Sequence, residues 1–254
     1  MNVYFLGTGT SQGIPVIGSK HSVCQSVDSR DKRLRVSVWI SWENHSYLID
    51  CGPDFRQQML ASNCQKVDAI LYTHEHSDHT AGLDDIRPFN FKQGEIPIYA
   101  HKRVIDNLKK RFDYIFETKN KYPGAPSVKT IEVVNNYPFS IGNKMAVPIN
   151  VMHGSLQVFG YRIDDFAYLT DVKTIEKNEI DKLKNLKVLV VNALREEQHD
   201  THFNLQEALD FIALINPQKA YLTHISHIFG YHQEIQQKLP INVFLAYDNL
   251  QITI

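Results

Sequence analysis

The amino-acid sequence predicts an α/β protein built from mixed sheets with helices on their outside. Three observations support this prediction. Short apolar segments rich in Val, Ile and Tyr, bounded by Gly, Pro or Asn, recur along the whole chain. The first segments follow one another like hairpin strands, and later ones alternate with helical patterns. A second series begins near residues 158–163 and again shows strands first and helices later, which suggests two similar halves.

Each expected element follows from its own local pattern. The expected strands are residues 2–7, 35–42, 46–52, 69–73, 96–101, 129–134, 146–152, 158–163, 166–171, 188–193, 219–225, 242–247 and 250–254. The expected helices are residues 53–63, 102–112 and 204–215. In the last of these helices, Asn204 is a predicted N-cap because Glu207 follows three residues later.

Length and composition limit the protein class. The chain has 254 residues, of which 43 % are hydrophobic, so we expect one domain over residues 1–254 with a sizeable core. The net charge of −1 gives no general attraction to nucleic acid or to an anionic membrane. Three cysteines argue against a disulfide scaffold, and we find neither a signal peptide nor a run of about 18 apolar residues. We therefore expect a soluble, cytoplasmic protein.

One short segment concentrates side chains that bind metals. His74, His76, Asp78 and His79 lie within six positions, directly after the buried strand predicted at residues 69–73. In an extended segment, residues i and i+2 point to the same side, so His74 and His76 can meet one cation. Asp78 and His79 follow where the chain must turn, and they can face a second cation. Imidazole and carboxylate ligands suit Zn, Mn or Fe.

Three further polar residues lie at the ends of apolar strands. They are His153, Asp171 and His224. A single histidine after a strand is usually a satisfied surface or core residue. Three such residues in equivalent positions indicate a shared site instead.

These motifs resemble those of a known family. The segment from His74 to His79 resembles the H-x-H-x-D-H signature of the metallo-β-lactamase superfamily, and the three later residues match its further metal motifs in order. Residues 47–55, "YLIDCGPDF", resemble its first motif, with Asp50 as the aspartate that supports a metal ligand. The resemblance implies a four-layer αββα sandwich with the metals at one edge.

The resemblance also implies a ligand assignment for two divalent ions, zinc or manganese. One ion would be held by His74, His76 and His153. The other would be held by Asp78, His79 and His224. Asp171 would bridge the two ions, whereas the antibiotic-hydrolysing branch usually has cysteine at that position.

The N-terminal segment resembles the phosphodiesterase branch of the superfamily. Residues 7–18, "GTGTSQGIPVIG", are similar to phosphoribosyl 1,2-cyclic phosphate phosphodiesterase-like proteins. Those proteins carry a structural zinc, and His21, Cys24 and His227 stand at three of its ligand positions. Ser19 and His21 replace two of the family's cysteines, so the resemblance leaves open whether this additional zinc is retained.

The same branch implies a catalytic role for His202, which lies 22 positions before His224. A histidine there acts as general acid in the resembling enzymes, and such an acid contributes about 10²–10⁴-fold to the rate. His199 is the competing residue for this role. Asp78 could orient the nucleophile in addition to binding metal.

The expected function is hydrolysis of a small cyclic or linear phosphodiester. Three alternatives remain open at this stage: ribonuclease Z-like processing of tRNA 3′ ends, thioester hydrolysis of the glyoxalase II type, and metal binding without turnover. The neutral charge balance and the lack of an inserted basic arm argue against a nucleic-acid substrate. No membrane partner is expected, and a homodimer is one open assembly state.

Overall fold

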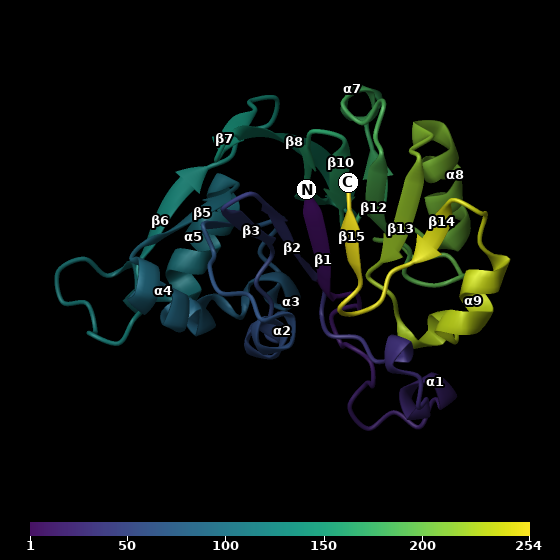
Figure 1. Ribbon diagram of the computed structural model, residues 1–254, viewed down its shortest axis with the longest axis horizontal. Helices are drawn as coiled ribbons and strands as arrows, with labels where there is room; N and C mark the ends of the chain where they lie inside the picture. Colours follow the sequence, from purple (N-terminus) through teal and green to yellow (C-terminus); the bar gives the residue numbers. More distant parts are fainter.

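The computed structural model describes residues 1–254 and contains two mixed β-sheets packed face to face (Figure 1). In the first sheet the strand order is β15-β1-β2-β3-β4-β5-β6. Its strands are β1 (Asn2–Gly7), β2 (Ser37–Trp42), β3 (His45–Ile49), β4 (Ala69–Leu71), β5 (Ile96–Ala100), β6 (Val128–Glu132) and β15 (Gln251–Thr253). Strands β15, β1, β2 and β3 pair antiparallel, and β3 to β6 pair parallel.

The second sheet repeats this plan, with the order β11-β8-β9-β10-β12-β13-β14 and with β7 paired to β8. Its strands are β7 (Phe139–Ile141), β8 (Lys144–His153), β9 (Leu156–Ile163), β10 (Phe166–Leu169), β11 (Thr174–Ile175), β12 (Val188–Asn192), β13 (Lys219–Thr223) and β14 (Val243–Leu245). Strands β8, β9 and β10 are antiparallel, and β10, β12, β13 and β14 are parallel. The two similar halves expected from the sequence are therefore present.

Helices cover the outer faces of both sheets. The helices of the chain are α1 (Ser22–Gln25), α2 (Phe55–Ser62), α3 (Ser77–Thr80), α4 (Arg87–Gln93), α5 (Lys102–Arg111), α6 (Asp113–Phe116), α7 (Lys177–Asp181), α8 (Leu205–Ile215) and α9 (His232–Lys238), with short 3₁₀ helices at Ser29–Asp31, Leu83–Ile86 and His227–Phe229; α1 lies apart from both sheets (Figure 1). In Figure 1, α4 and α5 lie beside the first sheet, and α8 and α9 lie beside the second. No helix is long and apolar enough to cross a membrane.

Three apolar clusters hold these layers together. The central cluster joins the inner faces of the two sheets, for example Phe5 and Ile40 with Phe159 and Tyr161. A second cluster packs the first sheet against α2, α4 and α5, and a third packs the other sheet against α8 and α9. Burial on both faces explains why the parallel strands read as continuous apolar runs. The predicted αββα sandwich is confirmed.

The predicted helices are confirmed with end shifts of at most two residues. Asn204 caps α8 as expected, because its side chain accepts the amide of Glu207 and the Glu207 carboxylate accepts the amide of Asn204. Local patterns did not predict α1, α4, α6, α7 and α9, which have four to seven residues each. They also did not predict β7 and β11, which have three and two residues. Segments of this length show too few turns or alternations to reveal a period.

Candidate metal centre

The metal-binding segment lies at the carboxyl end of β4. No helix or strand covers residues 72–76; the chain bends at Glu75 and enters α3, whose N-cap is His76. Two backbone bonds hold it against the segment after β3: the Cys51 amide donates to the His79 carbonyl at 2.8 Å, and the Gly82 amide donates to the Cys51 carbonyl at 2.9 Å. A Cβ at Gly52 would lie 2.1 Å from the Asp78 carbonyl oxygen, so only glycine allows this approach.

Three residues of the site share an unusual backbone conformation. Asp50, Asp171 and His224 have φ values of 64°, 58° and 57°, in the left-handed region. Each lies one or two residues beyond the end of a strand: β3, β10 and β13 respectively. Non-glycine residues adopt this conformation at some cost, and such residues concentrate at functional sites. Here the conformation turns the chain out of the strand at the point where the side chain enters the site.

The structure brings all seven predicted ligands together. The Nε2 atom of His79 lies 3.3 Å from Asp78 Oδ2 and 3.3 Å from Asp171 Oδ2. The Nε2 atom of His224 lies 3.4 Å from Asp171 Oδ1. The remaining rings complete the group: the His74 ring centre is 4.5 Å from that of His76, and the His76 and His153 centres are 5.4 Å apart. Asp171 contacts both His79 and His224, which is the position expected of a bridging carboxylate.

The donor atoms fit divalent metal ions. The Nε2 atoms of His74, His79 and His224 are buried and have no hydrogen-bond partner. An unpaired buried polar atom costs about 1–3 kcal/mol, so these nitrogens require another kind of partner. Ligand atoms of His74, His79 and Asp171 lie within 4.8 Å of one another, as do those of Asp78, His79 and His224. Imidazole nitrogens mixed with carboxylate oxygens are a donor set that suits zinc or manganese.

Burial and neighbouring charges act on the ionisation of this cluster. Burial holds the pKa of His74 well below its usual range, which keeps its ring neutral and able to ligate. Burial alone would raise the pKa of Asp171, but the charges of His224 and His79 outweigh it and hold that pKa well below its usual range. The site therefore combines a neutral imidazole with an ionised carboxylate.

Hydrogen bonds behind the ligands orient their rings. The Nδ1 atom of His79 lies 2.7 Å from Asp50 Oδ2, and Thr73 donates to both oxygens of Asp50 at 2.8 Å. The Nδ1 atom of His153 lies 2.7 Å from the Thr201 carbonyl oxygen. These contacts turn each Nε2 toward the cluster, which is how metal ligands are usually held. Asp50 lies where the resemblance predicts; Thr73 and Thr201 were missed because threonines beside a motif carry no signal of their own.

His202 lies in direct contact with the ligand cluster. Its Nε2 atom is 3.0 Å from Asp171 Oδ1, and its ring stacks 4.8 Å from that of His224. With His153 and Asp171 it forms a third group whose ligand atoms lie within 4.8 Å of one another. Burial lowers the pKa of His202 to about 4. This geometry suits a proton donor at the cluster and also an eighth ligand. His199 lies behind His202, with 3.3 Å between their Nδ1 atoms.

The predicted structural-zinc residues lie on α1 and the 3₁₀ helix that begins at His227. The rings of His21 and His227 meet edge to face, with 5.1 Å between their centres. The Cys24 sulfur is buried and accepts the Val16 amide at 3.5 Å. The three ligand atoms do not all lie within 4.8 Å of one another. The structure thus brings two of the residues into contact, and a zinc ion at this position stays a prediction.

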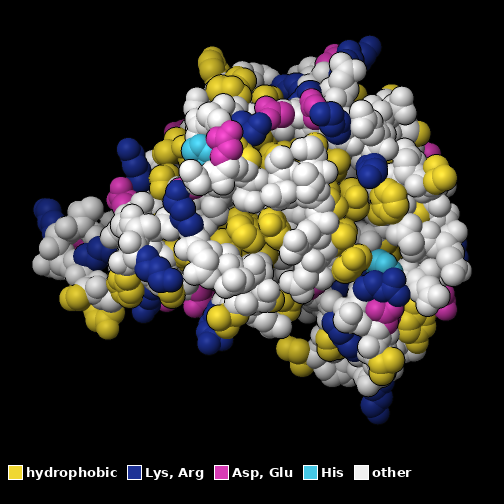
Figure 2. All heavy atoms as spheres, in the orientation of Figure 1, with side chains coloured by type: hydrophobic (Ala, Val, Ile, Leu, Met, Phe, Trp, Pro, Cys, Tyr) yellow, Lys and Arg dark blue, Asp and Glu magenta, His cyan; other side chains and the backbone are white.

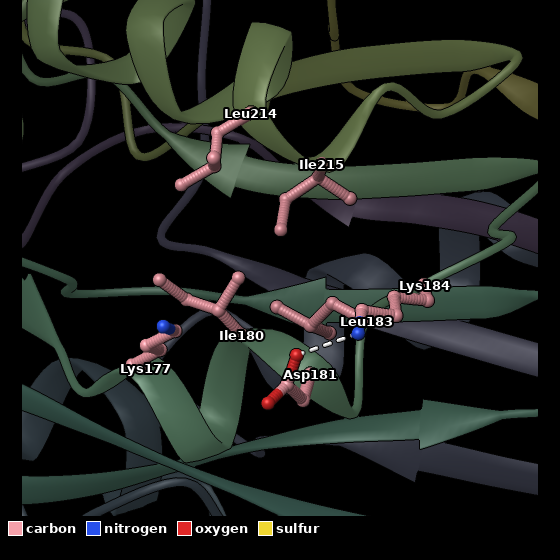
Figure 3. Close-up of a pocket in the computed structure, with 7 residues that line it drawn as sticks. All are labelled: Lys177, Ile180, Asp181, Leu183, Lys184, Leu214 and Ile215. Atoms are coloured by element: carbon pink, nitrogen blue, oxygen red, sulfur yellow. Dashed lines mark ion pairs between the residues drawn. The ribbon is translucent and has the colours of Figure 1, made fainter.

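An apolar pocket of about 390 Å³ lies away from this cluster (Figure 3). It is formed by α7, the segment after it, and the end of α8, and none of its lining residues is a predicted metal ligand. On the face shown in Figure 2, basic and acidic side chains are interspersed, without a broad basic surface.

Comparison with known proteins identifies the family. Residues 45–225 match the β-lactamase superfamily domain. The chain belongs to the metallo-β-lactamase superfamily. It has the fold of the metal-dependent hydrolases of this superfamily, and the resemblance noted in the sequence is confirmed.

Individual relatives refine this placement. The crystal structure of a new diphosphatase from the PhnP family superimposes with a TM-score of 0.92 at 36 % identity, covering 99 % of this chain and 96 % of that one. Octanoyltransferase from Porphyromonas gingivalis is 41 % identical over 100 % of this chain and 52 % of its own length. Ribonuclease Z from Enterococcus faecalis is 28 % identical over 66 % of this chain and 50 % of its length. The chain thus spans about half the length of the curated relatives it matches.

Proposed function

We propose that the protein is a metal-dependent phosphodiesterase that cleaves a phosphodiester or diphosphate bond in a small substrate. The observation that carries this proposal is the convergence of seven ligand side chains, three of which have buried Nε2 atoms without a hydrogen-bond partner. The 36 % identical diphosphatase covers nearly the full chain and supports the substrate class. We take the domain to extend over residues 1–254 and the location to be cytoplasmic, which fits three unpaired, buried cysteines.

In this proposal two divalent ions occupy the cluster, one held by His74, His76 and His153, the other by Asp78, His79 and His224. Such a pair supplies Lewis-acid stabilisation of phosphoryl charge and activation of water. Asp171 holds both positions together from the end of β10, and Asp50 keeps the His79 ring oriented.

His202 would protonate the leaving oxygen once the negative charge of a bound phosphoryl group raises the pKa of its ring from about 4 toward neutrality. Its ring enters from the segment before α8 and reaches Asp171, so a phosphoryl group at the cluster would lie within reach of Nε2. Asp78 would orient the attacking water through its free carboxylate oxygen. Proton donation matters most for alkoxide leaving groups, which depart poorly without it.

The experiment is a substrate panel with metal content measured on the same preparation. The panel contains a cyclic phosphodiester, a dinucleoside diphosphate, bis-p-nitrophenyl phosphate and a precursor tRNA. We expect about two metal equivalents per chain and turnover of the small esters, with removal of activity by a chelator and recovery with zinc or manganese. Cleavage of the tRNA alone would favour a ribonuclease, and binding of metal without any turnover would overturn the proposal. Light scattering of the same sample tests for a homodimer.

A thioester hydrolase is the second candidate. It is kept in the panel because the 41 % identical Porphyromonas gingivalis relative is an octanoyltransferase, although this chain matches 52 % of that protein and the name does not assign the activity to the matched half. An octanoyl thioester and a glutathione thioester therefore belong in the panel. Faster turnover of either thioester than of every phosphoester would replace the proposed function with this one.

A further inference from the structure

An ion pair outside the metal cluster is attached to the segment that carries it. Glu75 stands between His74 and His76, and its carboxylate is bound on both oxygens by Arg103 of α5. The Arg103 Nε atom donates to Glu75 Oε1 at 2.7 Å, and Nη2 donates to Oε2 at 3.1 Å. Paired bonds of this kind fix both distance and orientation. The side chain of Glu75 is 16 % exposed, so water competes only weakly for it.

Arg103 also contacts the β8–β9 hairpin, which carries His153, another predicted ligand of the same metal. Its Nη2 atom donates to the Gln157 carbonyl oxygen at 2.6 Å. Gln157 pairs with Met152 across the β8–β9 hairpin, and His153 is the last residue of β8. One guanidinium therefore connects the segment that carries His76 to the hairpin that carries His153.

His76 is the ligand that most needs such support. Of the three histidines assigned to the first metal, His74 and His153 each have a hydrogen bond at Nδ1, to Thr73 Oγ1 at 3.0 Å and to the Thr201 carbonyl at 2.7 Å. The His76 ring has no hydrogen bond, and the residue is exposed. Its position is thus set through the backbone next to Glu75.

A second arginine of α5 holds the same backbone. Arg111 donates to the Glu75 carbonyl at 3.1 Å and to Thr80 Oγ1 at 2.7 Å. It follows Arg103 by eight residues, slightly more than two helical turns, so both arginines lie toward the metal segment. Helix α5 is therefore a rigid support for the segment from Glu75 to Thr80.

We propose that Arg103 and Glu75 form a positioning pair that sets the separation of His76 and His153 and thereby the affinity of the metal these residues share with His74. The inference rests on the proposed two-metal site. It assigns α5, which contributes no ligand, a selective effect on one of the two metals.

The test is titration of the metal-free protein with Co²⁺, followed by its visible absorption, with zinc competition to obtain affinities. The variants are Arg103→Ala, Glu75→Ala and the double variant. The conservative variant Glu75→Gln keeps one acceptor oxygen for Arg103 and loses the second acceptor together with the negative charge. The control is Arg87→Ala, which removes an arginine of similar exposure that binds both oxygens of Asp84 away from the cluster.

We expect one of the two equivalents to bind about 10–100-fold more weakly in Arg103→Ala and Glu75→Ala, the usual loss when a supporting partner of a ligand is removed. Its absorption band should shift while the other equivalent is unchanged. The double variant should be no weaker than the weaker single variant, because the pair acts as a unit. Glu75→Gln should bind this equivalent with an affinity between those of Glu75→Ala and the wild type, because one of the two hydrogen bonds to Arg103 remains, and Arg87→Ala should match the wild type.

Wild-type affinity and spectrum in both alanine variants would overturn the proposal. So would equal weakening of both equivalents together with a lower melting temperature, which would indicate a general structural role. A wild-type protein that binds one equivalent would remove the two-metal basis. Because the readout is metal binding, a failure of the proposed phosphodiesterase activity leaves this test intact and is recognised separately.

Discussion

The two halves of the molecule build similar strands but deliver their ligands differently. Residues 47–50, Tyr-Leu-Ile-Asp, run across the end of β3, and residues 168–171, Tyr-Leu-Thr-Asp, run across the end of β10. Both strands are the last of an antiparallel set and the first of a parallel set, and both aspartates have left-handed backbones. Asp50 lies behind His79, whereas Asp171 contacts His79 and His224 directly. The same local device therefore makes a supporting residue in one half and a central one in the other.

The ligand supply differs as well. The first half places four ligands within six positions after β4, and the second half places His153, Asp171 and His224 at the ends of three separate strands. The compact set depends on local chain geometry. The dispersed set depends on the order and register of β8, β10 and β13, so the second sheet as a whole determines where these three ligands lie.

The largest expected difference is between substitutions of Asp50 and Asp171, which occupy equivalent positions in the two halves. We expect Asp171→Ala to abolish binding of both metals and all hydrolysis, because the carboxylate reaches both positions. We expect Asp50→Ala to weaken metal binding by about 10–100-fold, since it removes only a partner of His79. Metal analysis, kinetics and circular dichroism on matched preparations check this. Equal losses in two folded variants would contradict the difference between the halves.

His202 should give the next largest effect. Because His202 is the proposed proton donor, His202→Ala should lower kcat by about 10²–10⁴-fold for an alkyl ester. The loss should be smaller for bis-p-nitrophenyl phosphate, whose leaving group needs no proton. The metal content should stay at the wild-type value. The control is His199→Ala, which also removes an imidazole ring, but from the residue behind His202. It should have a much smaller effect. Loss of metal in His202→Ala would make it an eighth ligand instead.

Asp248 offers a test of the contact between the halves. It follows β14, and its carboxylate accepts the Thr8 hydroxyl at 2.7 Å and the Leu34 amide at 2.6 Å, both from the first half. Burial raises its pKa to about 6 from 3.8. The folded state therefore holds this proton more tightly than the unfolded state, and the free energy of unfolding should decrease as pH rises from about 4 to 6.

Asp248→Asn cannot ionise and should lack this decrease. Relative to the wild type, its stability should rise between about pH 4 and 6 by at most about 3 kcal/mol, and stay level above that range. Urea unfolding at several pH values measures the difference. A difference that is flat across this window would show that folding does not raise the pKa of the Asp248 carboxyl.

The smallest effect concerns the helix that follows His202. Asn204→Ala removes the cap of α8 and should lower the free energy of unfolding by about 1 kcal/mol. Metal content should not change, because no ligand lies on α8. Urea unfolding and metal analysis together check the result, and a loss of metal would mean that α8 also positions the second half of the site.

Much of the site could be predicted from local patterns. The strand before His74 shows as a run of apolar residues, and the spacing of His74, His76, Asp78 and His79 indicates metal binding without any partner from elsewhere. His153, Asp171 and His224 could be proposed because each follows an apolar strand. The match between residues 47–50 and 168–171 is a further signal in the sequence, and it relates Asp50 to Asp171.

The sequence by itself determined the α/β class, the cap of α8 and the identity of the metal-binding side chains, because periodicity, capping and ligand chemistry are properties of neighbouring residues. Only the tertiary structure decided which ligands meet, since this depends on strand order across two sheets. It also decided the left-handed backbones of Asp50, Asp171 and His224, which side-chain identity does not reveal. The contact between Arg103 and Glu75 spans 28 positions, and no local pattern relates the two residues before α5 packs beside the metal segment.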